Sequence, residues 1–172
     1  MNFIIVPFKS FKGAKSRMGK NLSDVDRVCI VRLMLEDVLH QVKQSKISNK
    51  NFIVTKDREA IKLAKKIGID ALVEKNQINE SASVDWASKQ LALLGGASVL
   101  RIPSDVPLVK SRDIDEIFDY AFVNNSCVIV PSRSGTGTNA ILRNPPDVIP
   151  SFFGPNSLQK HIEAFKTKKI RC

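Results

Sequence analysis

The apolar run FIIVP at residues 3–7 begins the pattern that decides the fold class. Similar strand-like runs recur at 52–55, 69–74, 98–103 and 127–131. Segments with helical spacing lie between each of these runs and the next. Strands alternating with helices in this way are typical of a largely parallel sheet covered by helices. We therefore predict one α/β domain over residues 1–172, with a mostly parallel, Rossmann-like sheet and helices on both faces.

Four helices are predicted from apolar periodicity and end signals. Their apolar positions are, in order, Val28, Val31, Leu35, Val38 and Val42; Ile61, Ala64 and Ile67; Val84, Ala87, Leu91 and Leu94; and Ile114, Ile117, Phe118 and Ala121. Ser23 with Asp26 resembles a capping box before the first helix. Gly68 is expected to end the second, and Ser111 to be the N-cap of the fourth.

The composition is that of an ordinary globular protein, with 43% hydrophobic and 26% charged residues. No apolar run approaches the roughly 20 residues of a membrane span. The N-terminal apolar run is too short for a secretory signal, so we expect a cytoplasmic protein without a membrane partner. Cys29, Cys127 and Cys172 suggest neither disulfides nor a zinc site. The net charge of +10 favours an anionic partner: nucleic acid, a phosphorylated metabolite or acidic lipid.

A basic segment, PFKSFKGAKSRMG, follows the first strand and contains Lys9, Lys12, Lys15 and Arg17. Ligands of parallel α/β sheets bind beyond the carboxyl ends of the strands, which is where this segment lies. Small residues between the cations let backbone amides approach a phosphate. The spacing is not that of a P-loop. The segment is either a phosphate-binding loop or a solvated basic loop.

A carboxylate, Asp105, lies just past the fourth strand in RIPSDVPLV. At that edge of the sheet it is placed to hold a divalent cation in a ligand crevice. The alternative is a turn aspartate that bonds its own backbone.

Two polar stretches occur near the C-terminal end. PSRSGTGTNA at residues 131–140 is richer in polar groups than a hairpin turn needs, so it is either a flexible loop or shaped to hold a ligand. In SFFGPNSLQKH, Gly154 and Pro155 fit an N-cap and a first helical position. Asn156 and Ser157 would then lie in a first turn whose free N–H groups favour an anion, or the segment is plain helix capping.

Three further residues that could carry chemistry are interpreted as structural. His40 and His161 lie in predicted helices and have no ligand partner nearby in the sequence. Trp86 lies off the apolar stripe of its helix, where packing is a better explanation than base stacking.

Six segments together resemble the 2-phospho-L-lactate guanylyltransferases, a group that includes enzymes using phosphoenolpyruvate or 3-phosphoglycerate. They are IIVPFKSFKGAKSRM, MLEDVL, ESASVDWA, LRIPSDVPLV, PSRSGTGTNAIL and FGPNSLQKH, in the family's order. The resemblance spans essentially the whole chain. It implies the nucleotide-diphospho-sugar-transferase-like fold of the molybdenum-cofactor guanylyltransferase type.

The resemblance also implies roles for particular residues. Thr138, Gly154 and Ser157 match the family's acceptor motifs and would bind the phospho-acid. The GTP-binding positions implied are Lys9, Lys15, Arg17 and Asp85. Asp105 matches the metal-binding aspartate of the superfamily, which implies Mg²⁺ as cofactor, and Lys15, Arg17 and Asp105 would be the catalytic residues.

The implied reaction joins GMP from GTP to a phospho-acid and releases pyrophosphate, in biosynthesis of the deazaflavin coenzyme (factor 420). An oxygen of the acceptor phosphate attacks the α-phosphorus in line, and no general base is required because that phosphate is already ionised. GTP and a small phospho-acid are thus the expected partners. Nucleic acid is not expected, and the sequence leaves a homodimer open.

Two departures from the family pattern bear on these roles. Ser83-Val84-Asp85 stands where many relatives have Gly-Leu-Asn. The family continues past KKIRC with another strand and an LDID-like acidic segment, which we expect this chain to lack. The alternatives are a non-catalytic anion- or RNA-binding protein, and a nucleotidyltransferase with another acceptor, such as a molybdopterin or a sugar phosphate.

Overall fold

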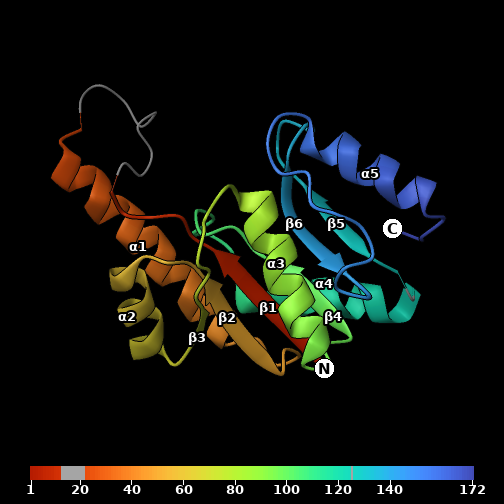
Figure 1. The fold of residues 1–172 in the computed structure, drawn as a ribbon, viewed down its shortest axis with the longest axis horizontal. Coiled ribbons are helices and arrows are strands. Elements are labelled where there is room, and N and C mark those ends of the chain that lie inside the picture. The colour runs from red at the N-terminus through yellow and green to blue at the C-terminus, as the bar shows by residue number, and fades with distance from the viewer. Residues whose placement is uncertain (13–21, 125) are drawn as a thin grey trace.

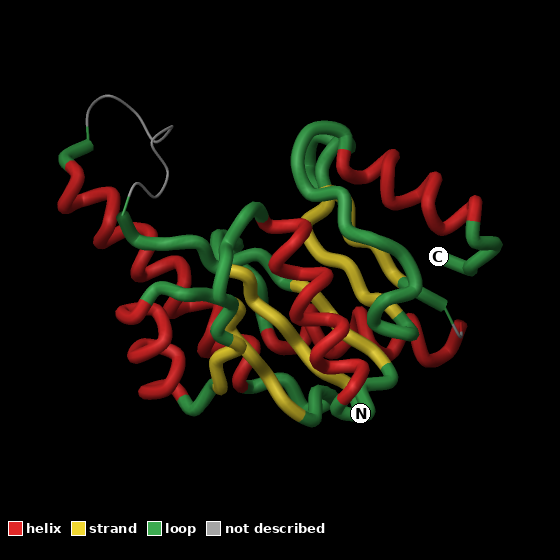
Figure 2. Tube along the Cα trace, in the orientation of Figure 1, coloured by secondary structure: helices red, strands yellow, loops and turns green. Residues whose placement is uncertain are grey.

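The computed structural model describes residues 1–12, 22–124 and 126–172, and the sheet has the order β3-β2-β1-β4-β6-β5. The strands are β1 (Asn2–Pro7), β2 (Lys50–Val54), β3 (Asp70–Leu72), β4 (Ser98–Arg101), β5 (Val128–Pro131) and β6 (Thr138–Arg143). The helices are α1 (Asp24–Lys43), α2 (Arg58–Ile67), α3 (Glu80–Leu93), α4 (Ser111–Asn124) and α5 (Ser157–Thr167). Figures 1 and 2 show the sheet between these helices.

The sheet is parallel from β3 to β4 and antiparallel beyond it. β1 pairs in parallel with both β2 and β4, whereas β6 is antiparallel to β4 and to β5. The prediction of a mostly parallel α/β sheet is confirmed. The antiparallel edge is a hairpin of β5 and β6. Because β6 is antiparallel to both of its neighbours, β5 runs in the same direction as β4. The carboxyl ends of β1, β3, β4 and β5 therefore meet at one edge of the sheet, the upper edge in Figure 2.

Helices cover both faces because side chains of each strand alternate between them. In β1, Ile4 and Val6 belong to the core cluster that contains buried residues of α1, α2 and α4. Phe3 and Ile5 point the other way, toward α3. α5 packs through Phe165 against Ile141 of β6 in a third cluster. In Figure 1, α3 passes in front of the sheet and α4 lies behind it.

Local signals explain where most helices begin and end. Ser23 is the N-cap of α1, with its hydroxyl accepting from the Asp26 N–H, and Gly68 ends α2 in the left-handed conformation at φ 84°. Both predictions are confirmed. The N-cap prediction for Ser111 is wrong by one position. Ser111 is the first residue of α4, and its N–H is donated to the side chain of Gln41.

Most predicted apolar positions lie in the core or pack against it, with three exceptions. Val28, in α1, and Leu94, just after α3, are exposed, and Ile61, in α2, is partly buried outside the core clusters. Trp86 is partly buried and packs against the α3 cluster, in agreement with a packing role. No helix in the described ranges is long and apolar enough to cross a membrane.

Candidate active site

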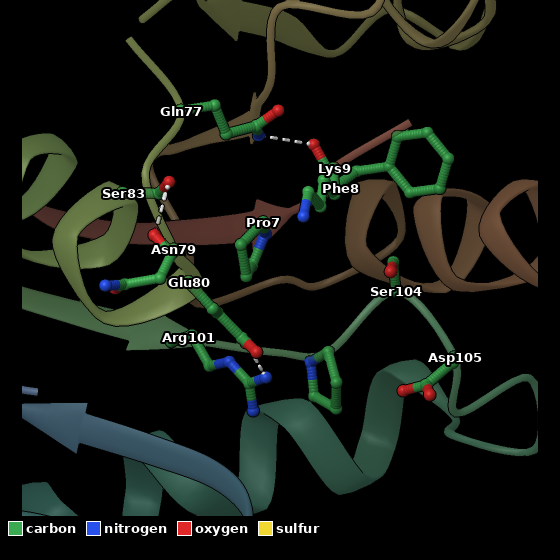
Figure 3. A pocket seen from close by; sticks show the side chains of 11 residues that line it. Pro7, Phe8, Lys9, Gln77, Asn79, Glu80, Ser83, Arg101, Ser104 and Asp105 are labelled. Carbon is green, nitrogen blue, oxygen red and sulfur yellow. Dashed lines mark hydrogen bonds and ion pairs between the residues drawn. The ribbon is translucent and has the colours of Figure 1, made fainter. Parts of the chain in front are cut away.

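A cavity lies where the chain order of the sheet reverses, between the carboxyl ends of β1 and β4. β1 is followed in the chain by β2 on one side and flanked by β4 on the other, which is the point where open α/β sheets bind ligands. The cavity has a volume of about 250 Å³ (Figure 3). It is lined by Pro7, Phe8, Lys9, Gln77, Asn79, Glu80, Ser83, Arg101, Pro103, Ser104 and Asp105.

Two predicted site residues come together in this cavity. Lys9 follows β1 and Asp105 follows β4, and both are exposed at the cavity. Lys15 and Arg17 lie outside the described residues. The structure thus brings the predicted cation and the predicted carboxylate to one place, as expected for loops that follow adjacent parallel strands.

Arg101 is a cavity residue that the sequence reasoning missed. It ends β4 with 5% of its surface exposed, and its guanidinium forms an ion pair with Glu80. Nη1 donates to the carbonyls of Thr138 and Asn139 at 3.4 and 3.1 Å, and Cζ lies 4.2 Å from the centroid of the Phe153 ring. The available signal was a single charge in the apolar run SVLRIP.

The beginning of α3 and the loop before it form another wall. Gln77 donates to the Phe8 carbonyl at 2.9 Å, and Asn79 caps α3 by accepting from the Ala82 N–H. The hydroxyl of Ser83 lies 2.8 and 2.9 Å from the two carboxylate oxygens of the buried Glu74. These contacts fix polar side chains at the cavity before any ligand enters.

Two residues of this cavity each carry a buried polar atom without a partner. In the described part of the chain, five buried side-chain oxygen or nitrogen atoms lack a hydrogen bond, and Gln77 Oε1 and Arg101 Nε are among them. Buried polar groups are almost always paired, so an unpaired one needs an explanation. These two atoms are enclosed by protein, so the groups that a ligand would meet in the cavity are its exposed ones, Lys9 and Asp105 among them.

The glycine-rich stretch 131–140 forms an ordered hairpin loop between β5 and β6. The Ser134 hydroxyl is hydrogen-bonded to the hydroxyls of Ser132 and Thr136, at 3.0 and 2.9 Å. Gly135 has a φ of 72°, a conformation that favours glycine. The Leu158 N–H donates to the Thr136 carbonyl at 3.1 Å, which fastens the loop to the start of α5. The loop is therefore shaped by its own hydroxyls and by α5.

The three predicted acceptor residues come together beside this loop. Thr138 begins β6, and its hydroxyl lies 3.1 Å from Nδ1 of His161, one turn beyond Ser157 in α5. Ser157 is buried, and its N–H donates to the Gly154 carbonyl at 3.2 Å. Gly154 has a φ of 131°, which L side chains rarely adopt. These residues do not line the cavity of Figure 3. Arg101 connects the two sites, because it lines that cavity and donates to the Thr138 carbonyl.

The start of α5 differs from the sequence prediction. The helix begins at Ser157 with Asn156 as N-cap at φ 56°, so Gly154 and Pro155 form the turn before it. The N–H groups of Ser157 and Leu158 donate to protein carbonyls. The predicted first turn of free N–H groups is thus wrong for these two, because the glycine turn and the hairpin supply their acceptors.

Asp85 lies in a separate network. Its carboxylate accepts from the Ser151 N–H and hydroxyl and pairs with Arg143 at 3.0 Å. Burial lowers the pKa of Arg143, and Asp85 opposes that shift. Both residues border another cavity, of about 230 Å³, which also touches Lys89. The structure does not place Asp85 in the cavity that Lys9 and Asp105 line.

The carboxylates of the cavity are the candidate ligands for a metal ion. Within residues 1–12, 22–124 and 126–172, no group of three or more histidine, cysteine or acidic side chains could hold an ion. Asp105 and Glu80 are both exposed carboxylates of the cavity; Asp105 lies beside Ser104, and Glu80 pairs with Arg101. Mg²⁺ commonly uses one or two carboxylates together with substrate phosphates, so this arrangement fits that ion.

Comparison with known proteins gives consistent matches over the whole chain. The family model described as "Guanylyl transferase CofC like" matches residues 2–172. A phosphoenolpyruvate guanylyltransferase of Rubrobacter xylanophilus is 28% identical over 98% of this chain and 82% of its own. A 2-phospho-L-lactate guanylyltransferase of Methanobrevibacter ruminantium is 28% identical over 98% and 74%.

Solved structures show the same fold. A protein of Desulfovibrio desulfuricans G20, described as a nucleotide-diphospho-sugar transferase, superposes with a TM-score of 0.81 at 14% identity. The match covers 99% of this chain and 77% of that one. At this identity the likeness speaks for the fold alone.

Proposed function

Because the chain belongs to the family of CofC-like guanylyl transferases, we propose that it transfers GMP from GTP to a small phospho-acid and releases pyrophosphate. Its relatives and its fold make it a nucleotidyltransferase. The proposed acceptors are 2-phospho-L-lactate, phosphoenolpyruvate and 3-phosphoglycerate. We place the product in deazaflavin coenzyme (factor 420) biosynthesis.

The observation that carries this proposal is the meeting of Lys9, Arg101 and Asp105 at one cavity beyond the carboxyl ends of β1 and β4. A nucleoside triphosphate suits these residues, since cationic side chains pair with its phosphates and a carboxylate can hold the divalent cation that accompanies them. GTP therefore occupies the cavity of Figure 3, with Lys9 beside its phosphates. Lys15 and Arg17, outside the described residues, are proposed as further triphosphate ligands and as catalytic residues.

The phospho-acid binds at the hairpin and α5, on Thr138, Gly154 and Ser157. Arg101 supports this placement because it borders the nucleotide cavity and donates to the Thr138 carbonyl. The two substrates would thus be held on either side of one buried cation. Holding two reactants in a fixed geometry is a large part of what such an enzyme has to do.

The chemistry needs positioning and charge rather than a general base. An oxygen of the acceptor phosphate attacks the α-phosphorus of GTP in line, and the bond from that phosphorus to the leaving pyrophosphate breaks. The positive charges of Lys9 and Arg101 offset charge that accumulates on the phosphoryl oxygens. Asp105 would hold Mg²⁺, which when bound supplies a further positive charge at the phosphates.

The proposal is tested by incubating the protein with GTP, Mg²⁺ and each of the three phospho-acids and measuring pyrophosphate. ATP and CTP serve as controls for the base. We expect pyrophosphate only with GTP and at least one of these acceptors. Absence of pyrophosphate with all three, from protein that binds GTP, would contradict the proposed function.

Replacing Asp105 tests the metal site within this scheme. Asp105→Asn keeps the shape of the side chain and removes the charge that a hard cation needs, so Mg²⁺-dependent turnover should be lost while the fold is kept. The measurement is the pyrophosphate rate across a Mg²⁺ titration, with thermal unfolding as the check on folding. Turnover near the wild-type rate would make Asp105 a turn residue only.

A further inference from the structure

His161 is a completely buried side chain at the centre of the proposed acceptor site. It is 0% exposed, and it is contacted by β6 and by the loop before α5. The Phe152 N–H donates to Nε2 at 2.9 Å, and the hydroxyl of Thr138 lies 3.1 Å from Nδ1. The rings of Phe152 and Phe153 meet the imidazole edge to face, with centroids 5.7 and 5.2 Å away. Both ring nitrogens are therefore engaged.

The backbone partner decides which nitrogen carries the proton. An amide N–H can only donate, so Nε2 of His161 must accept and cannot itself be protonated. The pKa of His161 is lowered to about 4, first by burial and then by the charges of Arg143 and Arg101, while the Ser157 backbone and Asp85 act in the opposite direction. The ring is neutral near pH 7, and its single proton lies on Nδ1.

This tautomer fixes the role of the Thr138 hydroxyl. With the proton on Nδ1, the ring donates to Thr138 Oγ1, so the hydroxyl must direct its own hydrogen elsewhere. Among the described residues, no second partner for this hydroxyl is found. The hydroxyl thus offers a donor at the site and has one oxygen lone pair already used.

We propose that His161 is a positioning residue, which holds the Thr138 hydroxyl as a hydrogen-bond donor toward an anionic oxygen of the phospho-acid. This inference rests on the proposed function of the site. A donor favours phosphate or carboxylate oxygens and disfavours ligand groups that donate, such as N–H. His161 therefore contributes to acceptor selection without touching the acceptor.

Two substitutions separate the two ring nitrogens. His161→Asn keeps a donor near the position of Nδ1 and removes the acceptor for the Phe152 N–H. His161→Gln keeps an acceptor near the position of Nε2 and removes the donor to Thr138. We expect His161→Gln to raise the acceptor KM about tenfold or more with little change in the GTP KM. His161→Asn should stay within a few-fold of the wild type in both.

The design includes a matched control and a double variant. His40, the other histidine and exposed on α1, is replaced by Gln as well, and no KM should move. Thr138→Val combined with His161→Gln should raise the acceptor KM no further than Thr138→Val alone, because His161 acts through the hydroxyl. Additive effects, or equal shifts for the Asn and Gln variants, would indicate a purely structural role and overturn the inference.

A measurement without turnover distinguishes failure of this inference from failure of the proposed function. Long-range ¹H–¹⁵N NMR spectra of the wild-type protein report which imidazole nitrogen is protonated, with His40 as the internal reference. The expected result is the Nδ1–H tautomer for His161, and an Nε2–H tautomer overturns the inference. A wild type without pyrophosphate release for any acceptor contradicts the proposed function instead.

Discussion

Arg101 and Arg143 are two buried arginines on the neighbouring strands β4 and β6, and they differ in how completely their guanidinium groups are hydrogen-bonded. Arg143 is 1% exposed and donates to Asp85, Ser88 and the Ile149 carbonyl at 2.7–3.0 Å. Arg101 is 5% exposed and has Glu80 and two carbonyls, but its Nε has no partner. In the described part of the chain, that Nε is the one buried side-chain nitrogen without a hydrogen bond.

The difference separates a structural arginine from a site arginine. A buried cation with its donors paired has completed its interactions within the protein. A buried cation with an unpaired donor beside a ligand-binding cavity can gain a hydrogen bond and an ion pair when an anion binds there. Burial alone would have put both arginines in one class.

The largest expected effect is on stability, at Arg143. Replacing Arg143 with Met leaves the carboxylate of Asp85 without its cation, in a side chain only 27% exposed. Breaking such a pair typically costs about 3–5 kcal/mol of unfolding free energy, and partial exposure places this case at the lower end. Urea unfolding measures the loss. Arg101→Met is the matched comparison and should cost less, because Glu80 is 41% exposed and can be hydrated.

If Arg101→Met destabilises the protein as much as Arg143→Met, the distinction between the two arginines fails. Both variants keep a long apolar stem, so a difference between them reports the charged head. The measurement therefore compares two positions within one fold.

The elements, and part of the site, follow from local sequence. Apolar periodicity and capping residues such as Ser23 act over a few positions and can be read from the chain. Lys9 and Asp105 were predicted because each follows a strand, and parallel strands end at one edge. The partners of buried charges were not predictable. Arg143 meets Asp85 across 58 positions of the chain, and nothing local encodes that pairing.

His161 illustrates the same limit. No ligand partner lies near His161 in the sequence, which predicts a structural role. Burial of the ring agrees, but its partner Thr138 lies 23 positions away on another element and was itself a predicted acceptor residue. Only the fold shows that the two act on one another.

Protonation of His161 should destabilise the folded protein at acid pH. The charges of both arginines contribute, because each lowers the pKa of this histidine. Its folded pKa of about 4 lies below the ordinary value of 6.5, so the unfolded state binds more protons between these values. Stability should fall as the pH drops from about 6.5 toward 4, by about 3 kcal/mol.

Urea unfolding at pH 7 and pH 4.5 measures this, with His161→Gln as the variant that lacks the group. The pH dependence should be smaller in that variant. In NMR titrations, Arg143→Met should raise the His161 pKa more than Arg101→Met, because Arg143 has the larger effect on the ring. An unchanged pH dependence in His161→Gln would exclude this histidine as the cause.

Activity should respond in the opposite order to stability. Arg101→Met removes the cation shared by the two proposed substrate sites, so kcat/KM should fall about a hundredfold, or about 2.7 kcal/mol. The variant should remain folded by circular dichroism. A fall confined to one substrate's KM would place Arg101 in a single site.

The proposed division into a nucleotide cavity and an acceptor site is tested by two crossed titrations on Lys9→Ala and Thr138→Val. GTP is varied at saturating acceptor, and acceptor is then varied at saturating GTP. Lys9→Ala should raise the GTP KM and leave the acceptor KM near the wild-type value. Thr138→Val should do the reverse, by roughly 1–3 kcal/mol, since it removes one polar contact and keeps the β-branched shape. If Thr138→Val shifts the GTP curve and leaves the acceptor curve unchanged, the two sites have been assigned the wrong way round.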